Sequence, residues 1–272
     1  MTDTLHPFDL AIALTPAGDD TFSGHTSVHY WNAISPFGGT TVATLLQAIL
    51  SHPARLGEPL AMTVNFAGPI QKGEFTVRVH AVRTGRSTQH WQLEIRQGED
   101  PEPVVTGSAV FAVRRETWSD TEARLPPFPA PETLARHAPP VNVPFLERYD
   151  MRYAANDGPL RGSGDSNTQC WISDVPPRAL DFPSIAAYCD AFVPRLFVRK
   201  GAPTPISTIT LSINFHVDGA TLERLQARHA FAQAKANAFN GGYYDQEGRL
   251  WAEDGTLLAT THQLVWYRDQ AL

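Results

Sequence analysis

The chain has 272 residues, a length that suits one large domain or two domains of about 135 residues each. Hydrophobic residues make up 42% and charged residues 18% of the sequence, which is typical of a soluble globular protein. The net charge of −6 gives no electrostatic reason to expect nucleic acid or an anionic membrane as a partner.

The N-terminal region shows no targeting signal, because no Lys or Arg occurs before Arg55 and signal and transit peptides carry such residues. No apolar run approaches the length of a bilayer span. We therefore expect a cytoplasmic protein without a membrane span. The two cysteines, Cys170 and Cys189, are too few for a disulfide framework or a zinc site, and we expect both to be packing residues.

The first half of the sequence predicts one long helix followed by an antiparallel meander. Residues 1–20 have little periodicity and are expected to pack as an arm, and residues 21–31 are strand-like. A helix is expected after Phe37-Gly38-Gly39, because the next apolar residues repeat with the spacing of a buried helical stripe: Val42, Leu45, Leu46, Ile49 and Leu50. Strands are expected at residues 60–70, 74–83, 88–96 and 104–114.

A proline-rich segment then divides the chain. Seven prolines lie between positions 126 and 144, where a regular strand ladder cannot form. We predict an N-terminal unit at residues 1–116, a linker at residues 117–146 and a C-terminal unit at residues 147–272.

The second half is organised around a helix that carries an aspartate. Asp181 is the expected N-cap, and Pro183 lies in the first turn. The apolar residues that follow have the spacing of one buried stripe: Ile185, Tyr188, Cys189, Phe192, Val193 and Leu196. Asp190 lies off this stripe, and Pro194 has no N–H to bond the Asp190 carbonyl, so the helix should kink or end there. A half-buried strand that carries Thr208 is expected next.

The two halves are weak copies of each other. Strands of the second half are expected at residues 167–173, 206–216, 242–244 and beyond, and 257–268, with a further strand or irregular segment ending at Asn240. Asn65 and Asn214, each followed by Phe, are 149 positions apart, and Arg114 and Arg268 are 154 positions apart. Nearly constant offsets of this kind indicate two similar units in tandem.

A single apolar helix wrapped by an antiparallel sheet leaves an unpaired sheet edge, and pairing two such units covers it. This arrangement resembles the double hot-dog fold, an α+β architecture of two tandem hot-dog units. The motifs are similar to those of the acyl-CoA thioesterase II family. In the first half they are Phe37-Gly38-Gly39, Gln47-Ala48, Pro69 and Thr84-Gly85-Arg86-Ser87. In the second half they are Ala187-Tyr188-Cys189-Asp190 with Pro194, Ser207-Thr208-Ile209, Phe215-His216 and Ala259-Thr260-Thr261-His262-Gln263.

The resemblance implies an acyl-CoA thioesterase of fatty acid metabolism, which hydrolyses acyl-CoA to free fatty acid and CoA. In that family an Asp, a Thr and a Gln orient and polarise the attacking water, and by motif these are Asp190, Thr208 and Gln263. The substrate-binding candidates are Phe37, Gly38, Gly39, Gly85, Arg86 and Ser87. A thioester is an activated acyl group that needs only an oriented water, a proton acceptor and hydrogen bonds to the oxyanion, so we expect no metal and no cofactor.

Each candidate also has a purely structural interpretation. A lone helical Asp is usually a solvated or capping residue, a Thr in a strand is a common β-former, and a Gln is by default a surface amide. The Phe37-Gly38-Gly39 stretch is either a simple turn or a helix start whose free N–H groups hold a carbonyl oxygen or a phosphate. Two other functions stay open: a non-catalytic acyl-CoA binding protein, and a hot-dog enoyl-CoA hydratase, which would favour an Asp/His pair near the helix start.

We expect one active site per chain, in the second half, and a homo-oligomer. Aligning the helical stripes and the strands gives the counterparts of the candidate residues in the first half: Gln47 for Asp190, Pro59 for Thr208 and Val110 for Gln263. None of the three has the polar group that would let it replace its counterpart. The first half should then form the other wall of the substrate slot.

Overall fold

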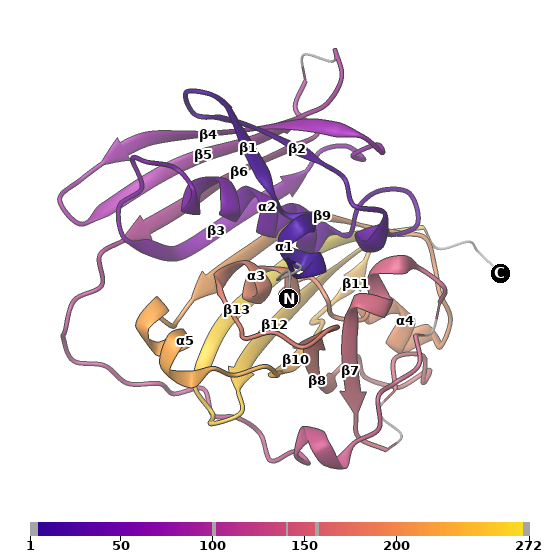
Figure 1. The fold of residues 1–272 in the computed structure, drawn as a ribbon. Helices are drawn as coiled ribbons and strands as arrows, with labels where there is room; N and C mark the ends of the chain where they lie inside the picture. The colour runs from indigo at the N-terminus through magenta and orange to yellow at the C-terminus, as the bar shows by residue number, and fades with distance from the viewer. Residues whose placement is uncertain (1–4, 100–101, 140, 156–157, 269–272) are drawn as a thin grey trace.

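The computed structural model describes residues 5–99, 102–139, 141–155 and 158–268, which form one antiparallel sheet around two central helices (Figure 1). The N-terminal half contributes α1 (Pro7–Ala11), β1 (Leu14–Gly18), β2 (Thr21–His25), α2 (Gly38–Leu50), β3 (Glu58–Phe66), β4 (Glu74–Thr84), β5 (Thr88–Arg96) and β6 (Val105–Ala112). The C-terminal half contributes β7 (Tyr149–Tyr153), β8 (Thr168–Asp174), α3 (Phe182–Tyr188), α4 (Arg195–Lys200), β9 (Ile206–Phe215), α5 (Gly219–Leu225), β10 (Ala230–Lys235), β11 (Phe239–Asn240), β12 (Tyr243–Ala252) and β13 (Leu257–Tyr267).

The two halves join edge to edge in the middle of the sheet. The strand order is β1-β2-β4-β5-β6-β3-β9-β13-β12-β10-β8-β7, with β11 paired to β12. The central pair is β3 and β9, which run antiparallel, and the hydroxyls of Thr63 and Ser212 hydrogen-bond across it at 3.0 Å. Each half therefore covers a sheet edge that the other would leave unpaired.

Outward from this junction, the halves place their strands in matching order. Both also carry a register shift at the same place. In β3 the shift lies between Pro59 and Ala61, and in β9 it lies between Thr208 and Thr210, 149 positions later in each case. A β-bulge inserted at equivalent positions is a specific feature of the backbone, so the tandem repeat is structural as well as sequential. The double hot-dog fold predicted from the sequence is confirmed.

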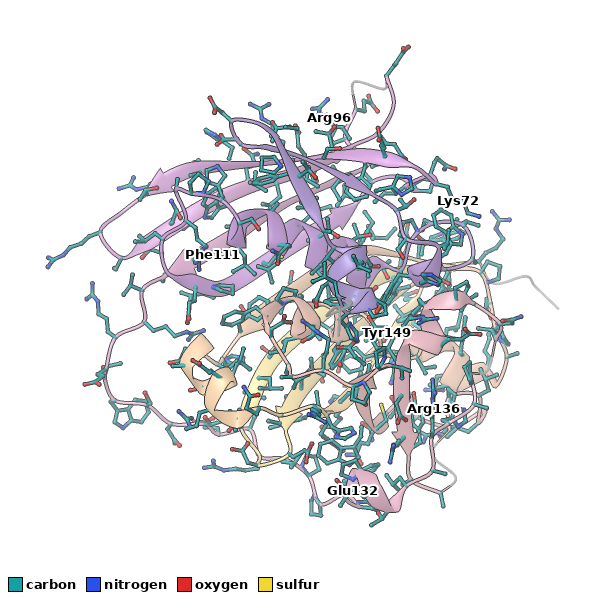
Figure 2. All side chains as sticks on the ribbon, viewed as in Figure 1. Lys72, Arg96, Phe111, Glu132, Arg136 and Tyr149 are labelled. Carbon is teal, nitrogen blue, oxygen red and sulfur yellow. The ribbon has the colours of Figure 1, made fainter. Side chains whose placement is uncertain are left out.

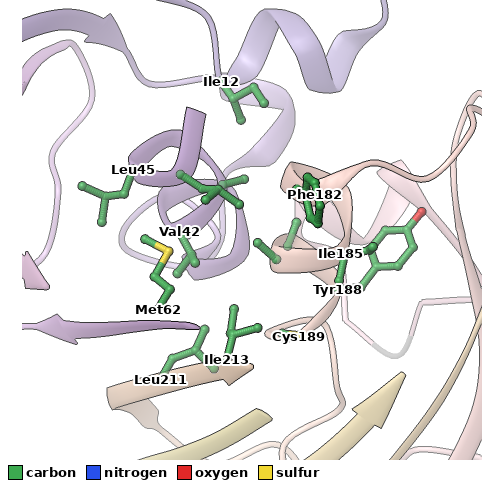
Figure 3. Close-up of a cluster of buried hydrophobic side chains, with 14 of the residues drawn as sticks. Ile12, Val42, Leu45, Met62, Phe182, Ile185, Tyr188, Cys189, Leu211 and Ile213 are labelled. Atoms are coloured by element: carbon green, nitrogen blue, oxygen red, sulfur yellow. The ribbon is translucent and has the colours of Figure 1, made fainter. Parts of the chain in front are cut away.

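The core lies between the sheet and the two helices. Figure 1 shows α2 and α3 side by side between the halves, and the two helices pack directly against each other. Val42 of α2 and Ile185 of α3 are fully buried, and Figure 3 shows them above Met62 of β3 and Ile213 of β9. Burying each such aliphatic side chain contributes roughly 1.5–3 kcal/mol. The two stripes recognised in the sequence thus face one common core.

The helix that precedes Asp190 ends earlier than expected. The α3 helix begins with the predicted Asp181 cap, whose carboxylate accepts the Ser184 N–H at 2.8 Å, but it ends at Tyr188, and a new helix, α4, begins after Pro194. Pro194 excludes a helical hydrogen bond to the Asp190 carbonyl and disfavours helical angles in the residue before it. The prediction of one continuous stripe to Leu196 was wrong, because Leu196 packs in a separate cluster with Tyr244 and Val265.

Four other elements differ from the sequence prediction. Within the described part of the expected N-terminal arm, α1 and the edge strand β1 form, and β1 pairs with β2. Residues 1–4 of that arm lie outside the described residues. The strand β7 and the helix α5 were not expected, since both are short segments with weak periodicity.

The proline-rich segment packs against the outer face of the C-terminal half. Trp171, Phe231 and Trp251 form a cluster on that face, and Leu125 and Phe128 of the segment cover it. The Trp171 indole donates to the Pro129 carbonyl at 2.8 Å. Figure 2 shows Glu132 and Arg136, which follow in this segment, beside the C-terminal half. The domain boundaries at residues 116 and 147 stay a prediction.

Candidate active site

Asp190 lies in the break between α3 and α4. Its N–H donates to the Ala187 carbonyl at 3.1 Å in a final tight turn, after which the chain leaves helical geometry. The break turns the side chain out of the helix face and toward the junction of the halves. Asp190 is only partly buried as a residue, unlike Cys189 beside it, which is fully buried. The aspartate that the sequence singled out is therefore accessible at a point where a helix ends.

Gln263 holds one oxygen of the Asp190 carboxylate. The Gln263 Nε2 donates to Asp190 Oδ1 at 2.9 Å and to the Cys189 carbonyl at 3.2 Å. Gln263 comes from β13 and is 3% exposed, so it is not the surface amide of the purely structural interpretation. Both of its N–H groups are engaged. The structure thus brings together two of the three predicted catalytic residues.

The N-terminus of α2 closes the site from the other half of the chain. A Cβ on Gly38 would lie 2.5 Å from Asp190 Oδ2, and a Cβ on Gly39 would lie 2.5 Å from the Ala187 carbonyl oxygen. The Gly39 N–H also hydrogen-bonds Asp190. Side chains are therefore excluded here because the backbone of one half approaches the other closely.

The two helix starts differ in how their N–H groups are used. At α3 the Asp181 side chain and Ser184 form a capping box, which satisfies the first-turn donors. At α2 the N-cap is Phe37, which has no side-chain acceptor, and its ring stacks on Phe145 at a centroid distance of 4.3 Å. Among the described residues, the N–H groups of Gly38 and Thr40 have no acceptor. They remain free to bind an oxygen of a ligand.

Burial tunes the acidity of Asp190. Loss of solvation raises the pKa of the carboxyl from 3.8 to about 7, against the opposing effects of the Gln263 and Gly39 hydrogen bonds. The group therefore changes its charge near neutral pH. A carboxylate with such a pKa both accepts a proton and releases it easily, as a general base requires.

Thr208 lies on the same face of the sheet as Gln263. It pairs with Val265, which is 2% exposed and points inward, and the register shift at Ile209 brings Thr208 to this face. Diagonal neighbours in such a ladder are about 7–8 Å apart, within reach of a long side chain such as that of Gln263. No hydrogen bond joins Thr208 to Asp190 or Gln263 within the described part of the chain.

The other substrate-binding candidates form the turn between β4 and β5. The Gly85 N–H donates to the Thr88 carbonyl at 2.8 Å, and Arg115 donates to the Ser87 hydroxyl at 3.1 Å. No hydrogen bond or ion pair among the described residues connects Gly85, Arg86 or Ser87 to Asp190. Their role in binding stays a prediction.

Two residues of this site were not predicted from the sequence. Gln246 of β12 and Arg195 of α4 are 2% and 0% exposed, and they extend the hydrogen bonds from Gln263 into the interior. A buried arginine without a nearby acidic residue leaves no pattern in the sequence. The position of Gln246 on an alternating strand was the only available signal.

The register of β6 also corrects one predicted counterpart. Met62 pairs with Ala109, as Leu211 pairs with Gln263, so the counterpart of Gln263 is Ala109 and not Val110. Ala109 is buried and nonpolar, so the conclusion that the first half lacks this amide is unchanged.

No cluster of three or more His, Cys, Asp or Glu residues suited to a metal ion occurs among the residues described. No helix within the described ranges is long and apolar enough to cross a membrane.

Comparisons with known proteins place these features in a family. Residues 27–112 match the acyl-CoA thioesterase N-terminal domain, and residues 121–267 match the acyl-CoA thioesterase C-terminal domain. The comparison with curated proteins finds no match.

Several solved structures are similar to this chain over nearly its whole length. A conserved hot-dog protein from Alicyclobacillus acidocaldarius has 43% identity and a TM-score of 0.93, with 98% of this chain and 100% of that chain covered. A putative thioesterase II from Thermobifida fusca has 16% identity and a TM-score of 0.82, with 96% and 97% covered. An acyl-CoA thioesterase II from Mycobacterium marinum has 16% identity and a TM-score of 0.75, with 97% and 99% covered. The domain matches and the 43% relative show that the chain belongs to the acyl-CoA thioesterase family, a family of thioester hydrolases.

Proposed function

We propose that the protein hydrolyses acyl-CoA thioesters with a water molecule activated by Asp190. The observation that carries this proposal is the meeting of a partly buried carboxylate with the uncapped N-terminus of α2. Asp190 Oδ2 faces Gly38, and the free N–H groups of Gly38 and Thr40 lie in the same first turn. One site thus offers a proton acceptor and donors for an oxyanion.

The reaction follows from the roles of these groups. A water between Asp190 Oδ2 and the Thr208 hydroxyl attacks the thioester carbonyl carbon and gives one proton to Oδ2. The carbonyl oxygen becomes an oxyanion, which the N–H groups at the start of α2 stabilise. The carbon–sulfur bond then breaks, and the CoA sulfur takes the proton from Asp190. The products are a carboxylic acid and CoA, and the carboxylate is regenerated.

Gln263 contributes chiefly by orienting Asp190. Both Gln263 N–H groups are engaged by Asp190 Oδ1 and the Cys189 carbonyl, so neither is free for the oxyanion. The predicted Asp, Thr and Gln set is retained in this proposal, with the amide holding the carboxylate.

Free thiol release from a panel of acyl-CoA esters tests the proposal, with Asp190→Asn as the decisive variant. Asn keeps the size of the side chain but cannot accept the proton, so turnover should fall by about a thousandfold or more. Asp19→Asn is the matched control, because Asp19 is exposed on the β1–β2 turn and far from α3 in the chain. Wild-type turnover in Asp190→Asn would rule out Asp190 as the group that activates the water. Saturable binding of acyl-CoA without any turnover by the unaltered protein would favour the non-catalytic binding protein instead.

A further inference from the structure

A continuous chain of buried side chains connects Asp190 to Arg195. Arg195 Nε donates to Gln246 Oε1 at 3.0 Å, Gln246 Nε2 donates to Gln263 Oε1 at 3.0 Å, and Gln263 Nε2 donates to Asp190 Oδ1 at 2.9 Å. The four residues come from α4, β12, β13 and the break after α3. Elements distant in the sequence therefore meet in one line of hydrogen bonds.

Arg195 sets the order of donors and acceptors along this line of hydrogen bonds. The oxygen and nitrogen of a Gln amide have the same shape, so two paired glutamines alone would allow either orientation. A guanidinium has donors only, so the Gln246 atom that faces Arg195 must be the oxygen. Gln246 then presents its nitrogen to Gln263, and Gln263 in turn presents its own nitrogen to Asp190. Arg195 thereby favours the same orientation of Gln263 as the Cys189 carbonyl, an acceptor that takes a Gln263 Nε2 hydrogen bond at 3.2 Å, and Asp190 Oδ1 meets a donor.

The other hydrogen bonds of Arg195 hold it rigidly in place. Its Nη1 donates to the Ser166 carbonyl at 2.8 Å, to the Thr168 hydroxyl at 2.7 Å and to the Ala234 carbonyl at 2.7 Å. Its Nη2 and Nε also donate to the Val193 carbonyl. Among the described residues, no Asp or Glu forms an ion pair with Arg195. Burial without a carboxylate is unfavourable for a charge, which makes a purely packing role a poor explanation.

The remaining ionisable groups around Asp190 stay neutral. Burial raises the pKa of Tyr149 on β7, of Tyr244 on β12 and of the Cys189 thiol, so none is charged near pH 7. Burial lowers the pKa of Arg195 to about 10, which still leaves it protonated at that pH. Arg195 is thus the one charged group in this line besides Asp190.

We propose that Arg195 and Gln246 are positioning residues for Asp190, which fix the Gln263 amide so that it donates to Oδ1 and leaves Oδ2 as the atom that takes the proton from water. This inference rests on the proposed function for the reaction, but the orientation of the amide does not depend on turnover. Oδ2 is the oxygen that faces Gly38 and the α2 N-terminus, where the substrate would bind.

Gln246→Glu should reverse the donor and acceptor roles along this line of hydrogen bonds while keeping a polar side chain between Arg195 and Gln263. A Glu carboxylate pairs with Arg195 and offers an acceptor to Gln263, so we expect the Gln263 amide to turn, giving up its bond to the Cys189 carbonyl, and to present its oxygen to Asp190. Two acceptors facing each other favour the protonated carboxyl. The pKa of Asp190 should rise by about one unit or more, and for a rise from about 7 to about 8 the ionised fraction and kcat/KM at pH 7 should fall about fivefold. Gln246→Met removes the hydrogen bonds of residue 246 and adds no charge. The pKa of Asp190 should then rise by less than in Gln246→Glu.

The readouts are the pKa of Asp190, followed by NMR of protein labelled with 13C at the aspartate carboxyls, and the pH profile of kcat/KM. The Asp190→Asn variant assigns the signal. Gln233→Glu is the matched control, because this β10 residue contacts Asn167 and takes no part in the line. A role in packing alone would lower the unfolding temperature and leave both readouts unchanged.

An unchanged Asp190 pKa in both Gln246 variants, with the fold intact by circular dichroism, would overturn the proposal. If Gln246→Glu does not fold, Gln246→Met decides alone. The NMR titration stands whether or not the protein turns over a thioester, so failure of this inference is distinguishable from failure of the proposed function.

Discussion

Gly38 and Asp190 touch across the junction of the two halves, with Asp190 Oδ2 at 2.5 Å from the position that a Gly38 Cβ would occupy. Any side chain at position 38 must displace the carboxylate. The Asp190 carboxylate is the end of a side chain and can move. A side chain at position 38 should therefore shift this carboxylate and leave the backbone in place.

Gly38→Ala and Gly39→Ala should therefore differ. Gly38→Ala should fold normally and lose about tenfold or more in kcat, because Asp190 is displaced. Gly39→Ala should lower the unfolding temperature as well, because its Cβ would meet the Ala187 carbonyl of the backbone at 2.5 Å. Thiol release and thermal unfolding of both variants check this, and Gly164→Ala, which has open space around it, is the control. Full activity in Gly38→Ala would contradict the close approach.

Thr208 and Gln263 should each affect the chemical step. Thr208→Val removes the proposed hydroxyl partner of the water, and Gln263→Leu removes the donor to Asp190. Each should lower kcat by roughly ten- to a thousand-fold with little change in KM. Thr210→Val is the matched control, because Thr210 pairs with Leu264 on the outer face of the same strand. A rise in KM alone would reassign the residue to substrate binding.

Stability should fall as the pH rises from about 4 to 8. Burial raises the pKa values of Asp174 and Asp190 from 3.8 to about 7. In that window the folded state binds more protons than the unfolded state, so the free energy of unfolding decreases with rising pH. The decrease due to these two groups reaches its full size above their folded pKa values.

Asp174→Asn and Asp190→Asn should each raise the unfolding temperature at pH 8 and have little effect at pH 4, with a gain on the order of 1–3 kcal/mol. Asp174 has a side chain with 0% exposure and does not contact the candidate site, so its variant should also keep thiol release. Thermal unfolding at both pH values is the measurement. Equal shifts at pH 4 and pH 8 would show that titration is not the cause.

Each chain should bind one substrate. The first-half counterparts of Thr208 and Gln263 are Pro59 and Ala109, which have no side-chain donor or acceptor. At the other end of α3, α5 has no equivalent in the first half, and its Gly219 N–H donates to both Glu58 oxygens at 3.1 Å. The polar groups where a second site would have to form are thus already hydrogen-bonded to each other.

Calorimetric titration with a non-hydrolysable acyl-CoA analogue should give a stoichiometry of one per chain. Gln47→Ala should leave substantial activity, since the Gln47 amide donates to Ser51 of its own helix end at 3.0 Å. Two equivalent sites per chain would refute the asymmetric arrangement.

The sequence by itself determined the helix and strand pattern and the tandem repeat, because these depend on local pattern: the apolar stripe of α2 from Val42 to Leu50, the alternation of strands such as β5, and a proline four residues after an aspartate. The double hot-dog fold, the family and the candidate role of Asp190 followed from the resemblance of its motifs to those of the acyl-CoA thioesterase II family. The offset of 149 positions indicated the repeat, and the structure adds that the same offset separates two β-bulges, one of which brings Thr208 to the inner face.

Only the tertiary structure decided how the site is held. The approach of Gly38 to Asp190 and the hydrogen bonds from Arg195 through Gln246 to Gln263 join residues distant in the sequence. The direction of hydrogen bonds between amides depends on which partner has donors alone, and that partner is known only when the chain is folded. A buried arginine and a strand glutamine therefore carry no recognisable pattern until packing places them in contact.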